Sequence, residues 1–263
     1  MDLNLKYKRC LIIGASRGLG FATAKTLSEE GAWVAINSRS ADNIQAAARR
    51  LEDGGAEKVL ALPGDVHDPE VPAKLVAEVV NDWGGLDILI TNSGGPPAGS
   101  FEVFTDEDWM AAFQLLFMSH VRLIRAALPY LRKSEAPSVL TITSNSVKQP
   151  IASLVLSNSI RAATVGLTKT LAIELGSEGI RFNSILPGWT ETERVDELMQ
   201  HRAKTNQTSV EEERAKIAQQ IPLGRIGRPE EFARAAAFLV SPAASYIHGV
   251  MLTVDGSAYK GTM

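Results

Sequence analysis

The sequence is poor in cysteine and in aromatic residues, and neither sign of charge dominates it. Cys10 is the only cysteine among 263 residues, which excludes an internal disulfide and favours a reducing, cytoplasmic setting. It precedes the apolar run 11–13, so we expect a buried, small hydrophobic side chain. The formal net charge of −3 leaves no basic footprint, and nucleic acid is therefore not an expected partner.

Long apolar runs are also absent. No uninterrupted apolar stretch approaches the ~20 residues that cross a membrane, and no apolar signal core precedes Gly14. We therefore expect neither a membrane segment nor a secretory signal. The length suits one α/β domain with one substantial core, so residues 1–263 are predicted to form a single cytoplasmic domain.

The chain does contain a regular alternation of strand-like and helix-like segments. Their apolar positions are nearly continuous in the strand-like runs, which is typical of parallel strands covered on both faces. The pattern predicts an α/β fold, a single Rossmann-type domain with a doubly wound seven-stranded parallel sheet and helices on both faces. The predicted strands are 10–14, 33–38, 59–66, 86–94, 138–144, 180–188 and 249–256.

Residues 189–229 break this rhythm. They contain two polar helical segments and follow the sixth predicted strand, at the sheet edge where such folds bind ligands. The sequence therefore predicts a helical lid near 189–229.

A glycine-rich motif, "GASRGLG" at 14–20, joins the first strand to the first helix. Glycines allow a tight turn and a close approach of the backbone, while the helix N-terminus stabilises the negative charge of a phosphate. At this junction the motif predicts dinucleotide binding. The predicted contacts in the loop are Gly14, Ser16, Arg17, Gly18, Leu19 and Gly20.

The end of the second strand favours NADP(H) over NAD(H). An NAD site usually places an acid there against the ribose 2′-hydroxyl, but residues 37–40 contain no carboxylate. Arg39, beside Ser38, and Arg17 can instead hold a 2′-phosphate through charge-assisted hydrogen bonds. The alternative is that both are ordinary solvated arginines.

Further motifs, taken with the glycine-rich loop, resemble the short-chain dehydrogenase/reductase family over about residues 7–258. The segments "GDV", "TNSGG", "RFNSILPGWTET" and "TVDG" carry the resemblance. In overall pattern the chain is similar to β-ketoacyl-acyl-carrier-protein-reductase-like members. The resemblance implies adenine contacts at Asp65 and Val66, ribose-side contacts at Asn92 and Gly94, and nicotinamide contacts at Pro187, Gly188, Thr190 and Thr192.

The resemblance also implies a catalytic set of Asn, Ser, Tyr and Lys, and three of the four are replaced here. The serine matches Ser144. The tyrosine position falls on Ser157 and the lysine position on Arg161, both within "SNSIRAA" at 157–163. The asparagine position falls on Leu116. The chain is therefore identified as a divergent member with an atypical active site.

The replacements change the acid–base chemistry of the site. A serine hydroxyl is a far weaker acid than a phenol, whose reference pKa is about 10. Arg161 stays charged, so it can bind ribose hydroxyls or a substrate anion but does not shuttle a proton at neutral pH. The four tyrosines, none of them near this segment in sequence, are Tyr7, Tyr130, Tyr246 and Tyr259.

Two other residues are candidates for the missing acid. Lys148 follows Ser144 by four residues, so it can overhang the nicotinamide and donate the proton; alternatively it is a solvent-facing loop lysine. His120 lies one helical turn beyond Leu116 and can approach the same space; alternatively it packs against a neighbouring helix or subunit.

Three functions remain open. The favoured one is an NADP(H)-dependent oxidoreductase acting on a carbonyl or alcohol, because positioning alone retains some rate of hydride transfer. The alternative is a nucleotide-binding but catalytically inactive sensor or assembly protein. The third is an elimination or isomerisation of an anionic substrate. The catalytic residues of the favoured reading are Ser144, Arg161, Lys148 and Ser157, with Arg161 also holding the cofactor ribose.

The expected partners are a small-molecule substrate and further copies of the chain. The family commonly forms tetramers through two long helices, which match residues 106–133 and 152–175. Both segments are apolar beyond one face, as an interface requires. Neither a membrane nor a metal ion is expected, since no metal-ligand spacing occurs.

Overall fold

Seven parallel strands form one sheet in the order β3-β2-β1-β4-β5-β6-β7. The structure, a computed structural model, describes residues 2–262. The strands are shorter than predicted because their carboxyl ends continue as loops, beginning with Gly14 at φ +64°. They are β1 (Arg9–Ile12), β2 (Trp33–Ser38), β3 (Val59–Pro63), β4 (Ile88–Thr91), β5 (Ser138–Ile142), β6 (Arg181–Pro187) and β7 (Met251–Val254).

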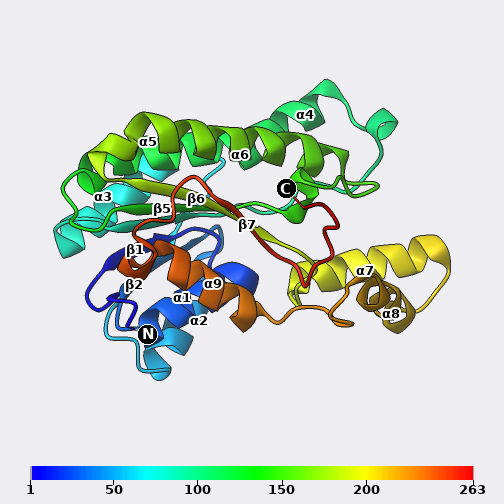
Figure 1. The fold of residues 1–263 in the computed structure, drawn as a ribbon, viewed down its shortest axis with the longest axis horizontal. Helices are drawn as coiled ribbons and strands as arrows, with labels where there is room; N and C mark the ends of the chain where they lie inside the picture. The colour runs from blue at the N-terminus through cyan, green and yellow to red at the C-terminus, as the bar shows by residue number, and fades with distance from the viewer. Residues whose placement is uncertain (1, 263) are drawn as a thin grey trace.

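Helices cover both faces of the sheet, which confirms the predicted fold class (Figure 1). One face carries α1 (Gly18–Glu29), α2 (Ala41–Asp53) and α9 (Pro229–Val240). The other carries α3 (Val71–Trp83), α5 (Ser119–Leu131) and α6 (Val155–Leu175), with α4 (Asp106–Phe113) leading into α5.

Each face has its own apolar core, which explains why the strands read as continuous apolar runs. Leu27, Ile44 and Phe232 belong to the core beneath α1, α2 and α9. Leu75 and Leu123 belong to the core on the opposite face. Burying each such side chain stabilises the fold by about 1.5–3 kcal/mol.

The sheet order places a topological switch point between β1 and β4. The chain runs outward from β1 to β3 on one side and from β4 to β7 on the other. In open α/β sheets, ligands bind outside the carboxyl ends of the strands at this point. Loops far apart in sequence, those after β1, β4, β5 and β6, therefore meet at one edge.

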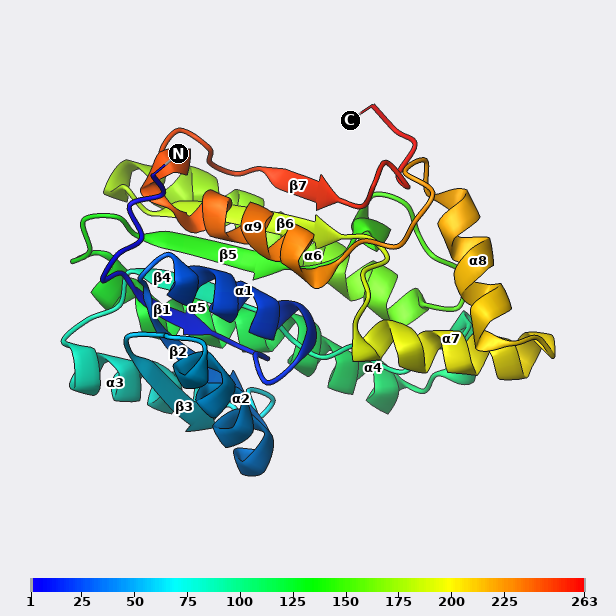
Figure 2. The same ribbon diagram turned by 90° about the horizontal axis from the view of Figure 1, so that it is seen from below.

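A pair of helices projects beyond that edge, as predicted for a lid. Figures 1 and 2 show α7 (Glu193–Asn206) and α8 (Val210–Gln220) extending to one side of the main body. The pair has a small apolar core of its own, in which Val195, Met199 and Ile217 are buried. The lid prediction near 189–229 is confirmed in its position and its helical content.

The helix that covers the sheet from Asp106 to Leu131 has a property that a search for uninterrupted apolar runs did not register. It is 26 residues long with a mean hydropathy of 1.2, enough by length and composition alone to cross a membrane. In this fold it lies against the sheet, where α5 buries Leu123, Ile124 and Ala127.

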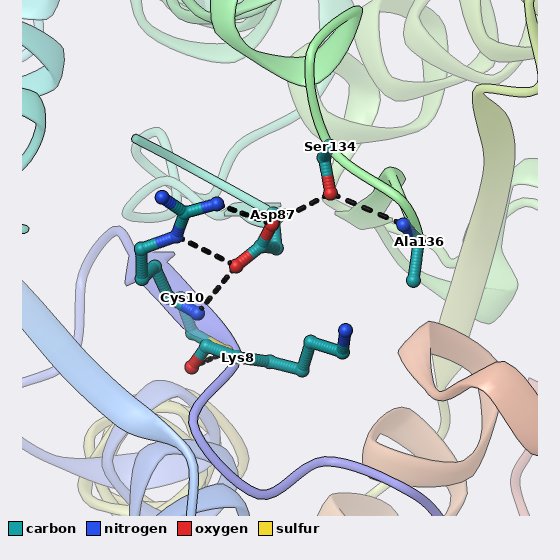
Figure 3. Close-up of polar contacts among 6 residues, drawn as sticks. Lys8, Cys10, Asp87, Ser134 and Ala136 are labelled. Atoms are coloured by element: carbon teal, nitrogen blue, oxygen red, sulfur yellow. Dashed lines mark hydrogen bonds and ion pairs between the residues drawn. The ribbon is translucent and has the colours of Figure 1, made fainter. Parts of the chain in front are cut away.

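At the opposite end of the sheet, a partly buried ion pair joins Arg9, the first residue of β1, to Asp87, the residue before β4. Asp87 accepts hydrogen bonds from the Arg9 side chain at 2.8 Å and from the Arg9 backbone N–H at 2.9 Å. Ser134 donates a fourth hydrogen bond to Asp87, at 2.6 Å, and its own hydroxyl oxygen accepts from Ala136 N–H (Figure 3). Burial acts to raise the pKa of Asp87, but these hydrogen bonds and the Arg9 charge outweigh it and leave the pKa below its ordinary value.

Asp87→Asn is expected to lower the free energy of unfolding by about 2–3 kcal/mol, because it leaves the partly buried Arg9 cation without its partner. A carboxyl whose pKa is lower in the folded state stabilises fully above its unfolded pKa of about 3.9 and loses that effect as the pH falls through the folded value. The difference between wild type and the variant should therefore shrink in acid.

Urea unfolding at neutral and acidic pH measures this difference. Glu178→Gln is the matched control, since Glu178 pairs with Arg132 at the exposed surface and should change little. An Asp87→Asn effect that is equally large at both pH values would show that the ion pair is not its cause.

Candidate active site

The loop after β1 has the geometry that a dinucleotide phosphate requires. Gly14 and Gly18 have φ values of +64° and +58°, in the left-handed region that favours glycine. A Cβ atom at Gly20 would lie 2.3 Å from the Gly14 carbonyl oxygen, so only glycine fits. No side chain caps the N-terminus of α1, which leaves its first amides available for an anion.

The loop after β4 supports the glycine-rich loop. Asn92 Nδ2 donates a hydrogen bond to the Gly14 carbonyl oxygen at 3.4 Å. A Cβ atom at Gly14 would lie 2.9 Å from the same nitrogen. Asn92 therefore stands beside the predicted phosphate loop, and the ribose-side contacts of Asn92 and Gly94 stay a prediction.

The end of β2 presents no carboxylate. Asn37 is buried and its Nδ2 donates to the carbonyl oxygens of Leu62 and Gly64, which ties β2 to the loop after β3. Ser38 donates to the Ser40 carbonyl, and Arg39 is exposed. The predicted 2′-phosphate site therefore faces solvent through Arg39.

Arg17, the second predicted 2′-phosphate ligand, points toward the lid. Its Nη2 lies 3.3 Å from Glu197 Oε1 of α7. On the adenine side, Val66 is buried and Asp65 accepts from His67 N–H, which shapes the loop after β3.

The turn after β6 lies against the end of β7. Gly188 N–H donates to the Val254 carbonyl oxygen at 2.9 Å, and a Cβ atom at Gly188 would lie 2.4 Å from Asp255 Cβ. This turn follows Pro187, which ends β6. Thr190 is buried and Thr192 is the N-cap residue of α7, so the predicted nicotinamide segment leads directly into the lid.

Ser144 follows β5 and begins the 3₁₀-helix Asn145–Val147. Its Oγ accepts a hydrogen bond from Ser146 N–H at 3.1 Å. Because that bond uses only a lone pair, the hydroxyl hydrogen can donate to a substrate oxygen. Ser144 therefore has a hydroxyl donor available at the carboxyl end of β5, and its catalytic role stays a prediction.

Arg161 is the best-defined feature of the site. Its guanidinium is buried, with Nε 3.2 Å from Ser157 Oγ and Nη2 3.4 Å from the Gly94 carbonyl oxygen. Nη1 lies 3.4–3.5 Å from the carbonyl oxygens of Thr143 and Ile142 at the end of β5. One side chain therefore joins α6 to the loops after β4 and β5.

The charge of Arg161 is not neutralised locally. Among residues 2–262, no carboxylate forms an ion pair or hydrogen bond with it. Burial, and next the positive charge of Arg194, lower the pKa of Arg161 to about 10. It is still a cation at neutral pH, so the site contains a buried positive charge directly behind the Ser157 hydroxyl.

The exposure of Lys148 does not decide between a proton donor and a solvent-facing loop lysine, the two alternatives that the sequence left open. Lys148 is half-buried, and its Nζ stands 5.3 Å from the centre of the Tyr259 ring. Tyr259 is far from Lys148 in sequence, and only the fold brings the two together. Asp255 accepts from the Tyr259 N–H at 2.8 Å, a local contact within the C-terminal segment.

Leu116 occupies the position of the family asparagine. It lies in the π-helix Gln114–Met118, fully buried in an apolar cluster with Leu156 and Ile160. Its carbonyl oxygen accepts from Thr164 Oγ1 at 2.8 Å. The π-helix, a feature frequent at functional sites, is therefore present without a polar side chain at position 116.

His120 is buried, and within the described chain neither ring nitrogen has a hydrogen-bond partner. Burial, and next the Arg161 charge, lower the pKa of His120 to about 3. It is therefore neutral at physiological pH and adds no second cation. Its burial agrees with the packing alternative.

Sequence reasoning missed Arg194. Its Nη2 donates to the Pro96 carbonyl oxygen at 3.1 Å, across 98 residues of chain, from the first turn of α7 to the loop after β4. No local pattern announces such a contact, because it depends on how the lid lies over the sheet edge.

Together these groups can stabilise negative charge on an oxygen atom. Two serine hydroxyls, a buried cation and a loop lysine lie around the carboxyl end of β5, next to a glycine-rich phosphate loop. Hydrogen-bond donors and positive charges fixed in advance around a developing oxyanion are usually the largest single contribution to catalysis.

Comparison with known proteins places these features in a family. A family model described as enoyl-(acyl carrier protein) reductase matches residues 14–257. The NADPH-dependent reductase BacG of Bacillus subtilis is 31% identical over 254 residues, 96% of this chain and 98% of that protein. The 3-oxoacyl-[acyl-carrier-protein] reductase FabG of Vibrio cholerae is 33% identical over 257 residues, 98% of this chain and 99% of that protein.

A solved structure is similar over nearly the whole length. The L-sorbose reductase of Gluconobacter frateurii, determined with NADPH and L-sorbose, has a TM-score of 0.95 and 32% sequence identity. The match covers 99% of this chain and 100% of that one.

Proposed function

This chain belongs to the short-chain dehydrogenase/reductase family, and on that premise we propose that it is an NADPH-dependent reductase of a carbonyl compound. The observation that carries the proposal is the joint presence of a glycine loop shaped for a dinucleotide and a buried cation bonded to the Ser157 hydroxyl. The NADPH-dependent activity named for the relatives supports it.

Different residues along the sheet edge are proposed to bind different parts of the cofactor. Gly14, Gly18 and Gly20 admit the phosphates, and Asn92 holds that loop in place. When bound, NADPH supplies the hydride. Arg39 holds the 2′-phosphate, since residues 37–40 offer no acid for a free 2′-hydroxyl. The remaining predicted contacts are Ser16, Arg17, Leu19, Ser38, Asp65, Val66, Gly94, Arg161, Pro187, Gly188, Thr190 and Thr192.

The catalytic residues are proposed to act on the carbonyl oxygen. Ser144 and Ser157 donate hydrogen bonds to it, and both hydroxyl hydrogens are available for this. Arg161 stabilises the negative charge that develops on that oxygen, acting through Ser157 at 3.2 Å. It keeps its own proton at neutral pH.

The final proton is proposed to come from Lys148, with Ser157 holding the oxygen while the transfer occurs. An ammonium group has three donors and exchanges readily with solvent from a half-buried loop. The neutral, buried His120 is left out of this step. In this proposal the two serines bind the carbonyl oxygen, Arg161 stabilises its charge and Lys148 donates the proton that a tyrosine phenol would otherwise donate.

The alternative, a catalytically inactive nucleotide-binding protein, is not favoured. It leaves the buried, uncompensated charge of Arg161 without a purpose, and an unpaired buried charge is costly to keep. The relatives named above are reductases.

The decisive assay is oxidation of NADPH with a panel of ketones, aldehydes and 3-oxoacyl thioesters. Lys148→Met should lower kcat by about 10²-fold while NADPH affinity is unchanged, because a general acid contributes at least that factor. Lys74→Met removes an exposed lysine from α3 and serves as control. Tight NADPH binding with no turnover on any substrate would instead support the inactive alternative.

Cofactor preference gives a separate prediction. Arg39→Leu should weaken NADPH binding about tenfold or more and leave NADH binding nearly unchanged, because only NADPH carries the 2′-phosphate that the guanidinium pairs with. Titration with both nucleotides measures this. Equal weakening of both would remove Arg39 from the 2′-phosphate site.

We also propose a cytoplasmic homotetramer. The lone buried Cys10 fits a reducing compartment. Met110 of α4 and Ile173 of α6 are 58% and 75% exposed, so each long helix still offers an apolar side chain to a partner. Light scattering on the purified protein tests the assembly.

A further inference from the structure

A chain of polar contacts crosses the sheet edge from the glycine-rich loop to the loop after β4. Glu197 of α7 lies at its centre, with Oε1 3.3 Å from Arg17 Nη2 and Oε2 3.4 Å from Arg194 Nη1. Arg194 Nη2 then donates to the Pro96 carbonyl oxygen at 3.1 Å. One carboxylate thus holds an arginine of the nucleotide loop and an arginine of the lid.

These polar contacts between Arg17, Glu197, Arg194 and Pro96 lie over the position expected for a dinucleotide pyrophosphate. A Cβ atom at Gly18 would lie 3.6 Å from both Thr192 and Glu193, and one at Gly95 would lie 2.9 Å from Arg194 Nη2. The start of α7 therefore touches both loops that flank the switch point. The uncapped N-terminus of α1, which favours phosphate, opens at the same place.

The local charges do not balance. Arg17, Arg194 and Arg161 contribute three positive charges; burial, and next the charge of Arg194, lower the pKa of Arg161, which is still a cation at neutral pH. Within residues 2–262, Glu197 is the one carboxylate paired with either Arg17 or Arg194, and Arg161 has none. With Glu193 also beside Gly18, one positive charge is left in excess, which an anionic group would neutralise.

The contacts of Glu197 are of the kind that exchange easily. The side chains of Arg17, Arg194 and Glu197 are 60%, 43% and 48% exposed, and exposed ion pairs contribute little to stability. A phosphate accepts from an arginine through two parallel N–H groups, which is a stronger interaction. A pyrophosphate should therefore displace the carboxylate.

The lid is built to allow this exchange. It has its own small apolar core, and a groove of about 1220 Å³ separates α1 from the first turn of α7. Figure 2 shows α7 and α8 projecting beyond the main body.

We propose that Arg194 binds the pyrophosphate of the cofactor. In the free protein the Glu197 carboxylate occupies the position of that pyrophosphate, so Glu197 competes with the dinucleotide for Arg194. The proposal rests on the proposed function, because it assumes a dinucleotide cofactor. The proposal adds Arg194 of the lid to the cofactor-binding site and makes Glu197 a residue that lowers the affinity for the dinucleotide.

Calorimetric titration with three ligands tests the proposal without any turnover assay. NADPH and ADP-ribose both carry the pyrophosphate, whereas 2′-AMP carries only the 2′-phosphate. Arg194→Met should weaken NADPH and ADP-ribose about tenfold to thirtyfold and leave 2′-AMP unchanged. Arg194→Lys should fall between, since a lysine keeps the charge and loses the fork.

Glu197→Gln should tighten NADPH and ADP-ribose about threefold to tenfold, because it removes the competing negative charge. Lys204→Met and Glu211→Gln make the same charge changes at exposed sites of the lid and should alter neither affinity. Thermal unfolding of each variant confirms that the lid is folded.

Two results would overturn the proposal: equal weakening of 2′-AMP by Arg194→Met, or an unchanged or weaker ADP-ribose affinity in Glu197→Gln. Equal weakening of 2′-AMP would show that Arg194 acts only through its long-range charge. An unchanged or weaker ADP-ribose affinity would show that the Glu197 carboxylate only stabilises the structure. Failure of the wild-type protein to bind NADPH at all is a different result, and it would refute the proposed function itself.

Discussion

Arg161→Met is expected to lower kcat by about 10²- to 10³-fold with a much smaller change in NADPH affinity. Methionine fills a similar volume but removes the positive charge behind Ser157, and with it the stabilisation of the developing oxyanion. The loss therefore falls on the transition state rather than on binding. Steady-state kinetics with the best carbonyl substrate, together with NADPH titration, separates the two.

Arg161→Lys should recover part of the lost rate, because it restores a cation without the full set of contacts to Gly94, Ile142 and Thr143. Arg125→Met removes an exposed arginine from α5 and should leave kcat unchanged. A wild-type kcat in Arg161→Met would exclude the buried cation from the mechanism.

Gly20→Ala is expected to weaken NADPH binding at least about 100-fold and to lower the free energy of unfolding by about 2–3 kcal/mol. The added methyl group would lie 2.3 Å from the Gly14 carbonyl oxygen and 2.9 Å from its carbon. Both atoms belong to the backbone, so relief requires that the phosphate loop itself move. The loop would then no longer present its amides to the phosphates.

Gly166→Ala is the matched control, because Gly166 lies within α6 and a Cβ atom there would meet no other part of the described chain within 4 Å. It should be neutral or stabilising by up to about 1 kcal/mol, since alanine favours a helix interior over glycine. Titration with NADPH and chemical denaturation of both variants test the contrast. Similar effects of the two substitutions would refute the steric argument.

Much of this protein was predictable from local sequence. The seven strands, the lid near 189–229 and the glycine-rich turn follow from the spacing of apolar residues and glycines, which act over a few neighbouring positions. Resemblance then aligned Ser144, Ser157 and Arg161 in one site, and the structure brings Arg161 within 3.2 Å of Ser157. These two residues are one helical turn apart, so their proximity is itself local.

The environment of those residues was not predictable in the same way. The sequence left Lys148 as either a proton donor or a loop lysine, and only the fold brings it together with Tyr259. His120 likewise had two interpretations until its burial against the interior was known. Burial depends on every element packed around a side chain, and no short window of sequence contains that information.

The sequence by itself therefore determined the order of strands and helices and the glycine-rich turn after the first strand. The tertiary structure alone decided that Arg161 is a buried cation without a carboxylate partner among the described residues and that Arg194 reaches Pro96 across the sheet edge. The physical reason is one of range. Propensity and turn geometry act between neighbours in the chain, whereas burial and charge act between neighbours in space, and these meet only when the parallel strands bring their carboxyl ends together.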